Sequence, residues 1–264
     1  MAWSFVAPSS RGIGFHLTRH LLQTTKIPVI ATARKDVGGV KKSLLEELNV
    51  DAERLTVLEV DVTDEKTIKR AAEEAELMFP KDKYHLRLAY SIPGILHPEK
   101  SPSQIDLKEI RDTFAVNTIG PLLIMKHFWE FLPTKSTDIS KQTPDTTGLP
   151  PHSVWLNMSA RVGSTSDNSL GGWYSYRASK AGVTSISKSF DNYLRNKSGD
   201  NAIAIAYHPG TVKTGLSKGF WQSVQNDKLF APEWAVDKMV GVANSVGVER
   251  RGRCWDWKGE EVLP

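Results

Sequence analysis

The 264-residue sequence predicts a single α/β domain over residues 1–264, a doubly wound, three-layer sandwich around a mainly parallel seven-stranded sheet. Two observations predict this fold. Short apolar runs alternate with longer amphipathic runs along the chain, which is typical of βαβ units with a buried parallel sheet. The length is also close to the upper limit of about 250–300 residues for one hydrophobic core, and the composition is 40% hydrophobic and 24% charged. Right-handed crossovers then place helices on both faces of the sheet.

Seven apolar runs rich in aliphatic and aromatic residues are the expected strands. They cover residues 3–7, 29–33, 55–59, 86–91, 154–158, 202–207 and 252–257. The amphipathic runs between them are the expected helices, over residues 12–24, 37–49, 64–79, 107–132, 173–196 and 232–246. Asp64 is a favourable N-cap for the third helix. Residues 133–151 are polar and rich in Thr, Ser and Pro, and are expected to form an inserted surface loop.

Composition excludes several classes of protein. A single cysteine, Cys254, allows no internal disulfide and no cysteine-based zinc site, so we expect a cytoplasmic protein without a metal. No run approaches the roughly 18 apolar residues needed to cross a bilayer, so no membrane partner is expected. The 34 basic and 30 acidic residues give a net charge of +4 and are interspersed, so no nucleic-acid partner is expected either.

The first candidate site follows the first strand, because ligands of such sheets bind beyond the carboxyl ends of the strands. There the chain turns into a helix through Ser9, Ser10, Arg11, Gly12, Ile13 and Gly14. Glycines at this turn let backbone N–H groups approach a pyrophosphate at the positive end of the helix. The same residues also suit an ordinary strand-to-helix turn.

Two charged residues extend this site. Arg34 follows the second strand, where arginine suits the 2′-phosphate of NADP(H) and an acid would suit the 2′-hydroxyl of NAD(H). Its alternative role is a solvated loop charge. Asp61 follows the third strand and could accept a hydrogen bond from an adenine amino group, or form an Asx turn before the helix.

The second candidate site is chemical. Tyr176 and Lys180 are four residues apart on an expected helix and therefore share one face. A phenol with a pKa near 10 is a poor acid or base at neutral pH, and a neighbouring ammonium lowers that pKa. A packing or exposed pair is the alternative. Ser159, at the end of the fifth strand, could bind a substrate oxygen or form a turn, and Asn117 lies mid-helix just before a kink expected near Pro121.

Six stretches that follow one another along the chain favour the functional alternative for these residues. They cover residues 10–14, 60–63, 116–121, 159–164, 171–180 and 208–214. With them the chain resembles the short-chain dehydrogenase/reductase family over nearly its whole length. It is most similar to the branch of small carbonyl reductases that includes sniffer and C-factor. The resemblance implies a Rossmann fold and NADPH-dependent reduction of a small, apolar ketone or aldehyde to an alcohol.

The resemblance also implies roles for individual residues. Tyr176 would give the proton to the carbonyl oxygen and Ser159 would hold that oxygen. Lys180 would bind the nicotinamide ribose and lower the pKa of Tyr176, while Asn117 would position a water leading to Lys180. The cofactor would contact the turn residues together with Arg34, Asp61, Val62, Ser91, Gly94, Asn117, Tyr176, Lys180, Pro209, Gly210, Val212 and Thr214. Residues 213–230 would form a substrate lid, with Trp173, Phe220 and Trp221 lining the pocket. Relatives pair through the helices at 107–132 and 173–196, which implies a homodimer or homotetramer.

Three departures from the family pattern stand out. Ala7-Pro8 replaces the usual Thr-Gly at the start of the turn, and Ser91-Ile92-Pro93-Gly94 replaces Asn-Asn-Ala-Gly after the fourth strand. Ser159-Ala160 replaces a Ser-Ser pair whose second member acts in many relatives, so either Ser159 shifts into the role or Ser164 reaches it. The altered turn motivates a rival function, a non-redox or regulatory cofactor-binding protein of cyclase or isomerase type on the same scaffold.

Overall fold

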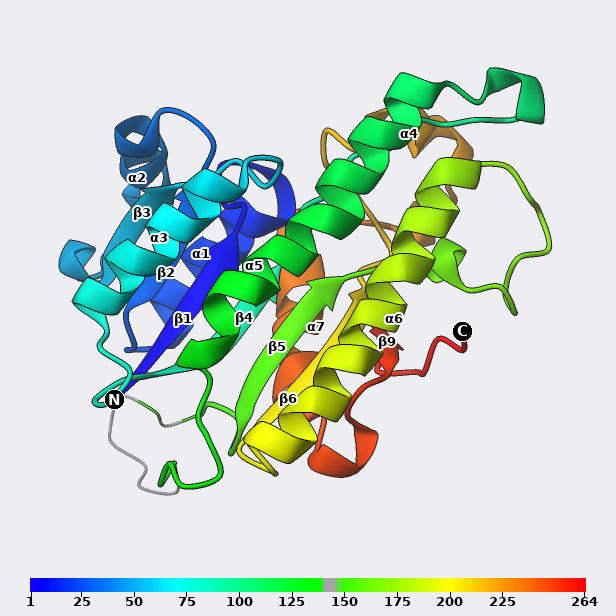
Figure 1. The fold of residues 1–264 in the computed structure, drawn as a ribbon. Helices are drawn as coiled ribbons and strands as arrows, with labels where there is room; N and C mark the ends of the chain where they lie inside the picture. Colours follow the sequence, from blue (N-terminus) through cyan, green and yellow to red (C-terminus); the bar gives the residue numbers. More distant parts are fainter. Residues whose placement is uncertain (140–145, 147) are drawn as a thin grey trace.

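The computed structural model describes residues 1–139, 146 and 148–264, and its centre is one seven-stranded sheet (Figure 1). The strand order is β3-β2-β1-β4-β5-β6-β9, and every neighbouring pair is parallel. The strands are β1 (Ala2–Ala7), β2 (Val29–Ala33), β3 (Leu55–Glu59), β4 (His85–Ser91), β5 (Ser153–Met158), β6 (Ala202–His208) and β9 (Cys254–Asp256). The expected strands are therefore confirmed, with shifts of at most two residues at their ends.

Helices cover both faces of this sheet (Figure 1). One face carries α1 (Gly12–Thr24), α2 (Val37–Leu45) and α7 (Pro232–Ser245), and the other carries α3 (Glu65–Met78), α4 (Leu107–Phe114), α5 (Gly120–Phe128) and α6 (Tyr174–Lys197). Because side chains alternate along a strand, Val6 packs into the core beneath α1 while Phe5 packs into the core beneath α5. The expected three-layer, doubly wound architecture is confirmed.

The stretch expected as one helix over 107–132 is divided. Between α4 and α5 the chain forms a π-helical turn at Ala115–Ile119, and a 3₁₀ turn at Trp129–Phe131 follows α5. Asn117 lies in the π-helical turn, four residues before Pro121, so the irregularity expected near that proline is present. At Gly120 a Cβ atom would lie 2.9 Å from Cβ of Val62, so the chain at the start of α5 closely approaches the loop that follows β3.

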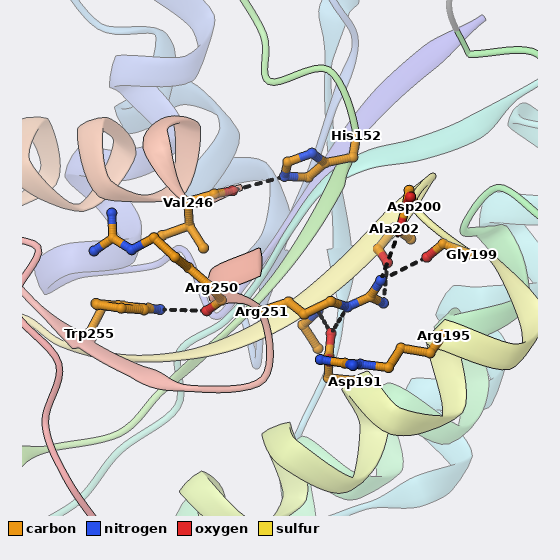
Figure 2. A network of polar contacts seen from close by, with 11 residues as sticks. His152, Asp191, Arg195, Gly199, Asp200, Ala202, Val246, Arg250, Arg251 and Trp255 are labelled. Carbon is orange, nitrogen blue, oxygen red and sulfur yellow. Dashed lines mark hydrogen bonds and ion pairs between the residues drawn. The ribbon is translucent and has the colours of Figure 1, made fainter. Parts of the chain in front are cut away.

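A buried polar network fixes the amino ends of β6 and β9 (Figure 2). The Arg251 side chain is 3% exposed, and its Nε donates to Oδ1 of Asp191 on α6 at 2.7 Å. Its other nitrogens donate to the carbonyl oxygens of Gly199 and Ala202 at 2.8 and 2.7 Å. Arg195 adds a longer contact of 3.3 Å to Asp191. This network lies at the edge of the sheet opposite the strand ends where the candidate site was expected.

Two other expectations concern surface segments. Of the loop expected at 133–151, residues 140–145 and 147 lie outside the described residues. In the described part, the Asn201 side-chain amide donates to the carbonyl oxygens of Thr134 and Thr137 at 2.8 and 2.9 Å. Residues 213–230, the expected lid, contain two 3₁₀ turns and end in β8 (Leu229–Phe230), which pairs in parallel with β7 (Thr211–Val212).

Candidate active site

Tyr176 and Lys180 occupy the first two turns of α6 and face the same way. The Lys180 ammonium lies 5.8 Å from the centroid of the Tyr176 ring, and Lys180 is only 1% exposed. Its Nζ donates to the carbonyl oxygen of Met158 at 2.8 Å and to that of Pro93 at 3.4 Å. The shared face expected from the spacing is confirmed, and the lysine joins the carboxyl ends of β4 and β5.

Burial dominates the titration of both groups. It lowers the pKa of Lys180 to about 7, since a charged ammonium is disfavoured away from water. It also raises the pKa of Tyr176 above its ordinary value. The expected lowering of the Tyr176 pKa by the lysine is therefore not observed, because burial of the phenol disfavours the phenolate. Tyr176 keeps its proton, which is the form that a proton donor needs.

Asn117 joins three segments of the site. Its Oδ1 accepts from the Ile95 amide at 2.8 Å, and its Nδ2 donates to the Ile95 carbonyl at 2.9 Å and to Oγ of Ser179 at 3.1 Å. The π-helical turn, the loop after β4 and α6 are thus held together by one amide. Because the side chain is occupied in this way, a water relay at this position would use the main chain of Asn117.

The two candidate serines differ in what their hydroxyl groups do. Ser159 is buried, donates to the Lys180 carbonyl at 3.0 Å and pairs with the Thr184 hydroxyl at 2.9 Å. Ser164 accepts from the Asp167 amide at 3.0 Å, and its own proton has no acceptor among the described residues. The Ser159 hydroxyl is thus bonded to the backbone of α6, whereas the Ser164 hydroxyl proton is not used in a hydrogen bond among the described residues.

The turn between β1 and α1 remains tight despite Pro8. The peptide bond between Ala7 and Pro8 is cis, and Gly12 has a φ of +56°. A Cβ atom at Gly14 would lie 1.8 Å from the Pro8 carbonyl oxygen, so this position requires glycine. No side chain caps α1 and its first turn holds no acid, so its positive end can receive a pyrophosphate. The expected glycine turn therefore fits a dinucleotide.

The other residues expected to bind the cofactor at this turn differ in their exposure to solvent. Ser10 and Arg11 are exposed and Ile13 is half-buried. Ser9 is fully buried, with its amide donating to the Thr32 carbonyl at 2.7 Å and its hydroxyl to the Val6 carbonyl at 2.9 Å. Both donors of Ser9 bond to carbonyl oxygens of β1 and β2, which gives Ser9 a structural role, and its expected contact with the cofactor stays a prediction.

The residues that follow β2 and β3 are those expected on the adenosine side of the cofactor. Arg34 is exposed, and neither it nor Arg11 has an ion-pair partner among the described residues. Asp61 accepts from the amide and hydroxyl of Thr63 at 2.9 and 2.6 Å, so it forms the Asx turn that was the alternative. Partial burial raises the Asp61 pKa, but these hydrogen bonds and the charges of Arg34 and Lys35 bring it below its ordinary value. Asp61 is ionised and leaves Oδ2 able to accept.

The stretch Ser91-Ile92-Pro93-Gly94, which departs from the family pattern, lies at the carboxyl end of β4. Ser91 is buried, and its hydroxyl has no partner in the described part of the chain. Ile92 places Cδ1 3.2 Å from where a Cβ of Gly14 would lie, so it packs against the glycine turn. Gly94 is flanked by Nζ of Lys180 and by Cδ1 of Leu216, which lie 3.7 and 3.5 Å from the position of its missing Cβ. Leu216, on the expected lid, therefore lies beside the lysine.

The segment after β6 closes the site. Gly210 has a φ of +75°, and a Cβ there would lie 2.5 Å from the Phe230 ring. Thr214 places Cγ2 3.5 Å from the position of a Cβ on Gly12, while Pro209 is half-buried and Val212 is buried. The beginning of the lid thus contacts the glycine turn, and the cofactor residues expected from both regions come together.

Aromatic residues meet above the tyrosine. The Trp173 ring lies 6.1 Å from Tyr176 and 5.0 Å from Phe220, centroid to centroid. Trp221 donates its indole N–H to Oγ of Ser217 at 2.8 Å, so it braces the lid internally. The structure therefore brings Trp173 and Phe220 to the tyrosine.

These features agree with the sequence comparison. A family model described as short chain dehydrogenase matches residues 3–139, just over half of the chain. The chain belongs to the short-chain dehydrogenase family. It is therefore an oxidoreductase by family.

Individual relatives support this assignment. The 1-hydroxy-2-glutathionyl-2-methyl-3-butene dehydrogenase of Rhodococcus sp. (strain AD45) is 27% identical over 194 residues, which cover 74% of each chain. Carbonyl reductase Sniffer of D. melanogaster superposes with a TM-score of 0.82 at 19% identity, over 100% of both chains. An NADPH-bound carbonyl reductase from chicken fatty liver superposes with a TM-score of 0.80 at 24% identity, over 99% of this chain and 98% of the other. The expected similarity to the sniffer-like branch is confirmed at the level of the fold.

Three features of this short-chain dehydrogenase were not predicted from its sequence. Leu216 beside Lys180 and Glu99 at the start of α6 have no motif to mark them. A groove of about 930 Å³ follows α7 and is lined partly by Phe230, Trp234 and Trp257, but by none of the expected catalytic residues.

Within the described residues, no group of three or more metal-binding side chains occurs and no helix is long and apolar enough to span a bilayer.

Proposed function

We propose that this protein is an NADPH-dependent oxidoreductase that reduces the carbonyl of a small, apolar ketone or aldehyde to an alcohol. The observation that carries the proposal is the buried pair of Tyr176 and Lys180 at the carboxyl ends of β4 and β5, below the aromatic contact of Trp173 with Phe220. A non-polar wall beside one protonated hydroxyl suits an apolar carbonyl compound.

The proton transfer is assigned to Tyr176. Its hydroxyl makes no hydrogen bond among the described residues, so it is free to donate to a carbonyl oxygen, and its high pKa keeps the proton in place until the oxygen gains charge. NADPH, when bound, supplies the hydride. Lys180 would hold the ribose of that cofactor and provide positive charge near the tyrosine as it donates. Asn117 keeps the loop at Ile95 against α6 and so fixes one wall of the site.

The carbonyl oxygen needs a second donor, and Ser164 is the better candidate because its hydroxyl proton is unused among the described residues, whereas that of Ser159 is bonded to the backbone of α6. We expect Ser164→Ala to lower kcat/KM for a carbonyl substrate by about 10²-fold, the size of effect that follows loss of one donor to a developing oxyanion. Ser159→Ala should change it little, because that hydroxyl is bonded to the backbone of α6. Steady-state kinetics of both variants decide the matter. A large loss in Ser159→Ala with none in Ser164→Ala would restore the role that the resemblance gave to Ser159.

Cofactor choice is assigned to Arg34, with Arg11 beside the turn. We expect calorimetric titration of the wild type to show tighter binding of NADPH than of NADH. Arg34→Ala should weaken NADPH binding by about tenfold to hundredfold, since a hydrogen bond to a charged group is worth about 1.5–3 kcal/mol, and should leave NADH binding unchanged. Lys42→Ala, an exposed change on α2, is the control. A wild-type preference for NADH would overturn the role of Arg34.

The rival function, a non-redox or regulatory cofactor-binding protein, rests on the altered turn. Ser9 has no donor free, and Ile92 packs against Gly14 where the family has an asparagine side chain. If the folded wild type binds neither nucleotide in the same titration, the reductase proposal fails and this rival gains support.

The proposed assembly is a homodimer or homotetramer. It is supported by three exposed hydrophobic side chains, Leu107 at the start of α4, Ile119 at the end of the π-helical turn and Tyr193 on α6. A cytoplasmic location is proposed from the single, buried cysteine.

A further inference from the structure

Glu99, in the long loop after β4, reaches the start of the catalytic helix. It is 1% exposed. Both oxygens of its carboxylate lie 3.3 Å from the Ser175 amide, and Oε1 also accepts a short hydrogen bond from the Ser175 hydroxyl. Its main-chain oxygen accepts from the Trp173 amide at 2.6 Å. One residue of this loop thus holds two of the three residues that precede Tyr176.

A buried carboxylate requires compensation, because removing it from water is costly. Glu99 has no ion-pair partner among the described residues. Its compensation comes from the two Ser175 donors and from the positive end of α6, which otherwise has no side-chain cap and no acid in its first turn. The loop after β4 therefore supplies, from 76 positions earlier in the chain, the cap that α6 lacks locally.

The residues that Glu99 holds are the ones the proposed reaction needs. Trp173 has a φ of 51°, an uncommon conformation for a bulky residue, and its amide bond to Glu99 helps to maintain it. The neighbouring Gly172 has a φ of +66°, and a Cβ there would lie 3.2 Å from the Glu99 oxygen. The position of the Trp173 ring beside Tyr176 thus depends on this close approach.

We propose that Glu99 is a positioning residue that clamps the first turn of α6 and thereby orients the Tyr176 hydroxyl and the Trp173 wall. Its catalytic consequence rests on the proposed reductase function, whereas the clamp itself does not. Neither oxygen of Glu99 needs to touch substrate or cofactor. A displacement of the reacting groups by about 1 Å is enough to cost up to 10²-fold in rate.

The test compares Glu99→Ala and Glu99→Gln with Glu73→Gln, an exposed carboxylate on α3 that serves as control. Hydrogen exchange of the amides in 172–178 should accelerate in Glu99→Ala and remain unchanged in the control. The kcat for carbonyl reduction should fall about tenfold to hundredfold and the KM for the carbonyl should rise, while the Kd for NADPH stays the same. Glu99→Gln, which keeps an acceptor for the Ser175 amide, should recover part of the loss.

Each contrary result has a distinct meaning. Unchanged exchange in 172–178 of Glu99→Ala would overturn the clamp. Faster exchange with unchanged kcat and KM would overturn the positioning role and leave Glu99 a contributor to stability. If Glu99→Ala does not fold, Ser175→Ala removes the hydroxyl donor alone and carries the same comparison. If the wild type reduces no carbonyl, the proposed function fails by that result, and hydrogen exchange still decides the clamp.

Discussion

Tyr176→Phe is expected to lower the rate of carbonyl reduction by about 10²–10⁴-fold, the usual contribution of a positioned general acid. The substitution removes one hydroxyl from a side chain whose ring is otherwise held by Trp173 and by the Lys180 ammonium, so packing should persist. NADPH affinity should therefore be retained. Stopped-flow measurement of NADPH oxidation, with binding followed separately by calorimetry, separates the two effects.

Tyr174→Phe provides a matched control for this experiment. Tyr174 lies on the same helical turn, is 39% exposed and has no expected role, so its loss should leave the rate unchanged. If Tyr176→Phe retained the wild-type rate, another group would have to donate the proton and the proposed mechanism would be wrong. Equal losses in both variants would point to damage of the helix rather than to chemistry.

Arg251→Ala is expected to reduce the free energy of unfolding by about 3–5 kcal/mol, because it leaves the buried Asp191 carboxylate without its main partner. It also frees two carbonyl oxygens, those of Gly199 and Ala202, which the guanidinium now satisfies (Figure 2). Urea denaturation followed by circular dichroism measures the loss.

Arg253→Ala is the control for this prediction. Arg253 is 44% exposed and pairs with Glu261 at the surface, where an ion pair contributes about 0–1 kcal/mol. A loss in Arg251→Ala no larger than in Arg253→Ala would show that Asp191 finds a substitute partner, for which Arg195 at 3.3 Å is the nearest candidate.

Features that depend on local pattern could be predicted from the sequence. The strands follow from apolar runs, and α1 begins and ends at the expected residues because the glycine turn and the start of the periodic pattern coincide. The shared face of Tyr176 and Lys180 follows from helical spacing alone. The irregularity near Asn117 was also expected, since asparagine followed by proline is unfavourable inside a helix.

Features that depend on partners distant in the sequence could not be predicted. Nothing local shows that the Ser159 hydroxyl bonds to the Lys180 carbonyl or that Glu99 caps α6. The direction of the Tyr176 pKa was mistaken for a related reason: the lysine is visible in the sequence, whereas burial of the phenol is a property of the assembled site. Chemistry near a residue can be inferred from a motif, but solvent access cannot.

The burial of Lys180 has a consequence for the thermodynamics of the proposed cofactor. With a pKa of about 7, this side chain carries a proton only part of the time near neutral pH. A ribose hydroxyl that accepts a hydrogen bond from Lys180 would favour the charged lysine, so binding would take up a proton and raise this pKa. Proton and nucleotide then strengthen each other's binding, and the affinity for NADPH falls as the pH rises above 7. A lysine that the fold holds away from water thereby couples the loading of the enzyme to the acidity of its surroundings.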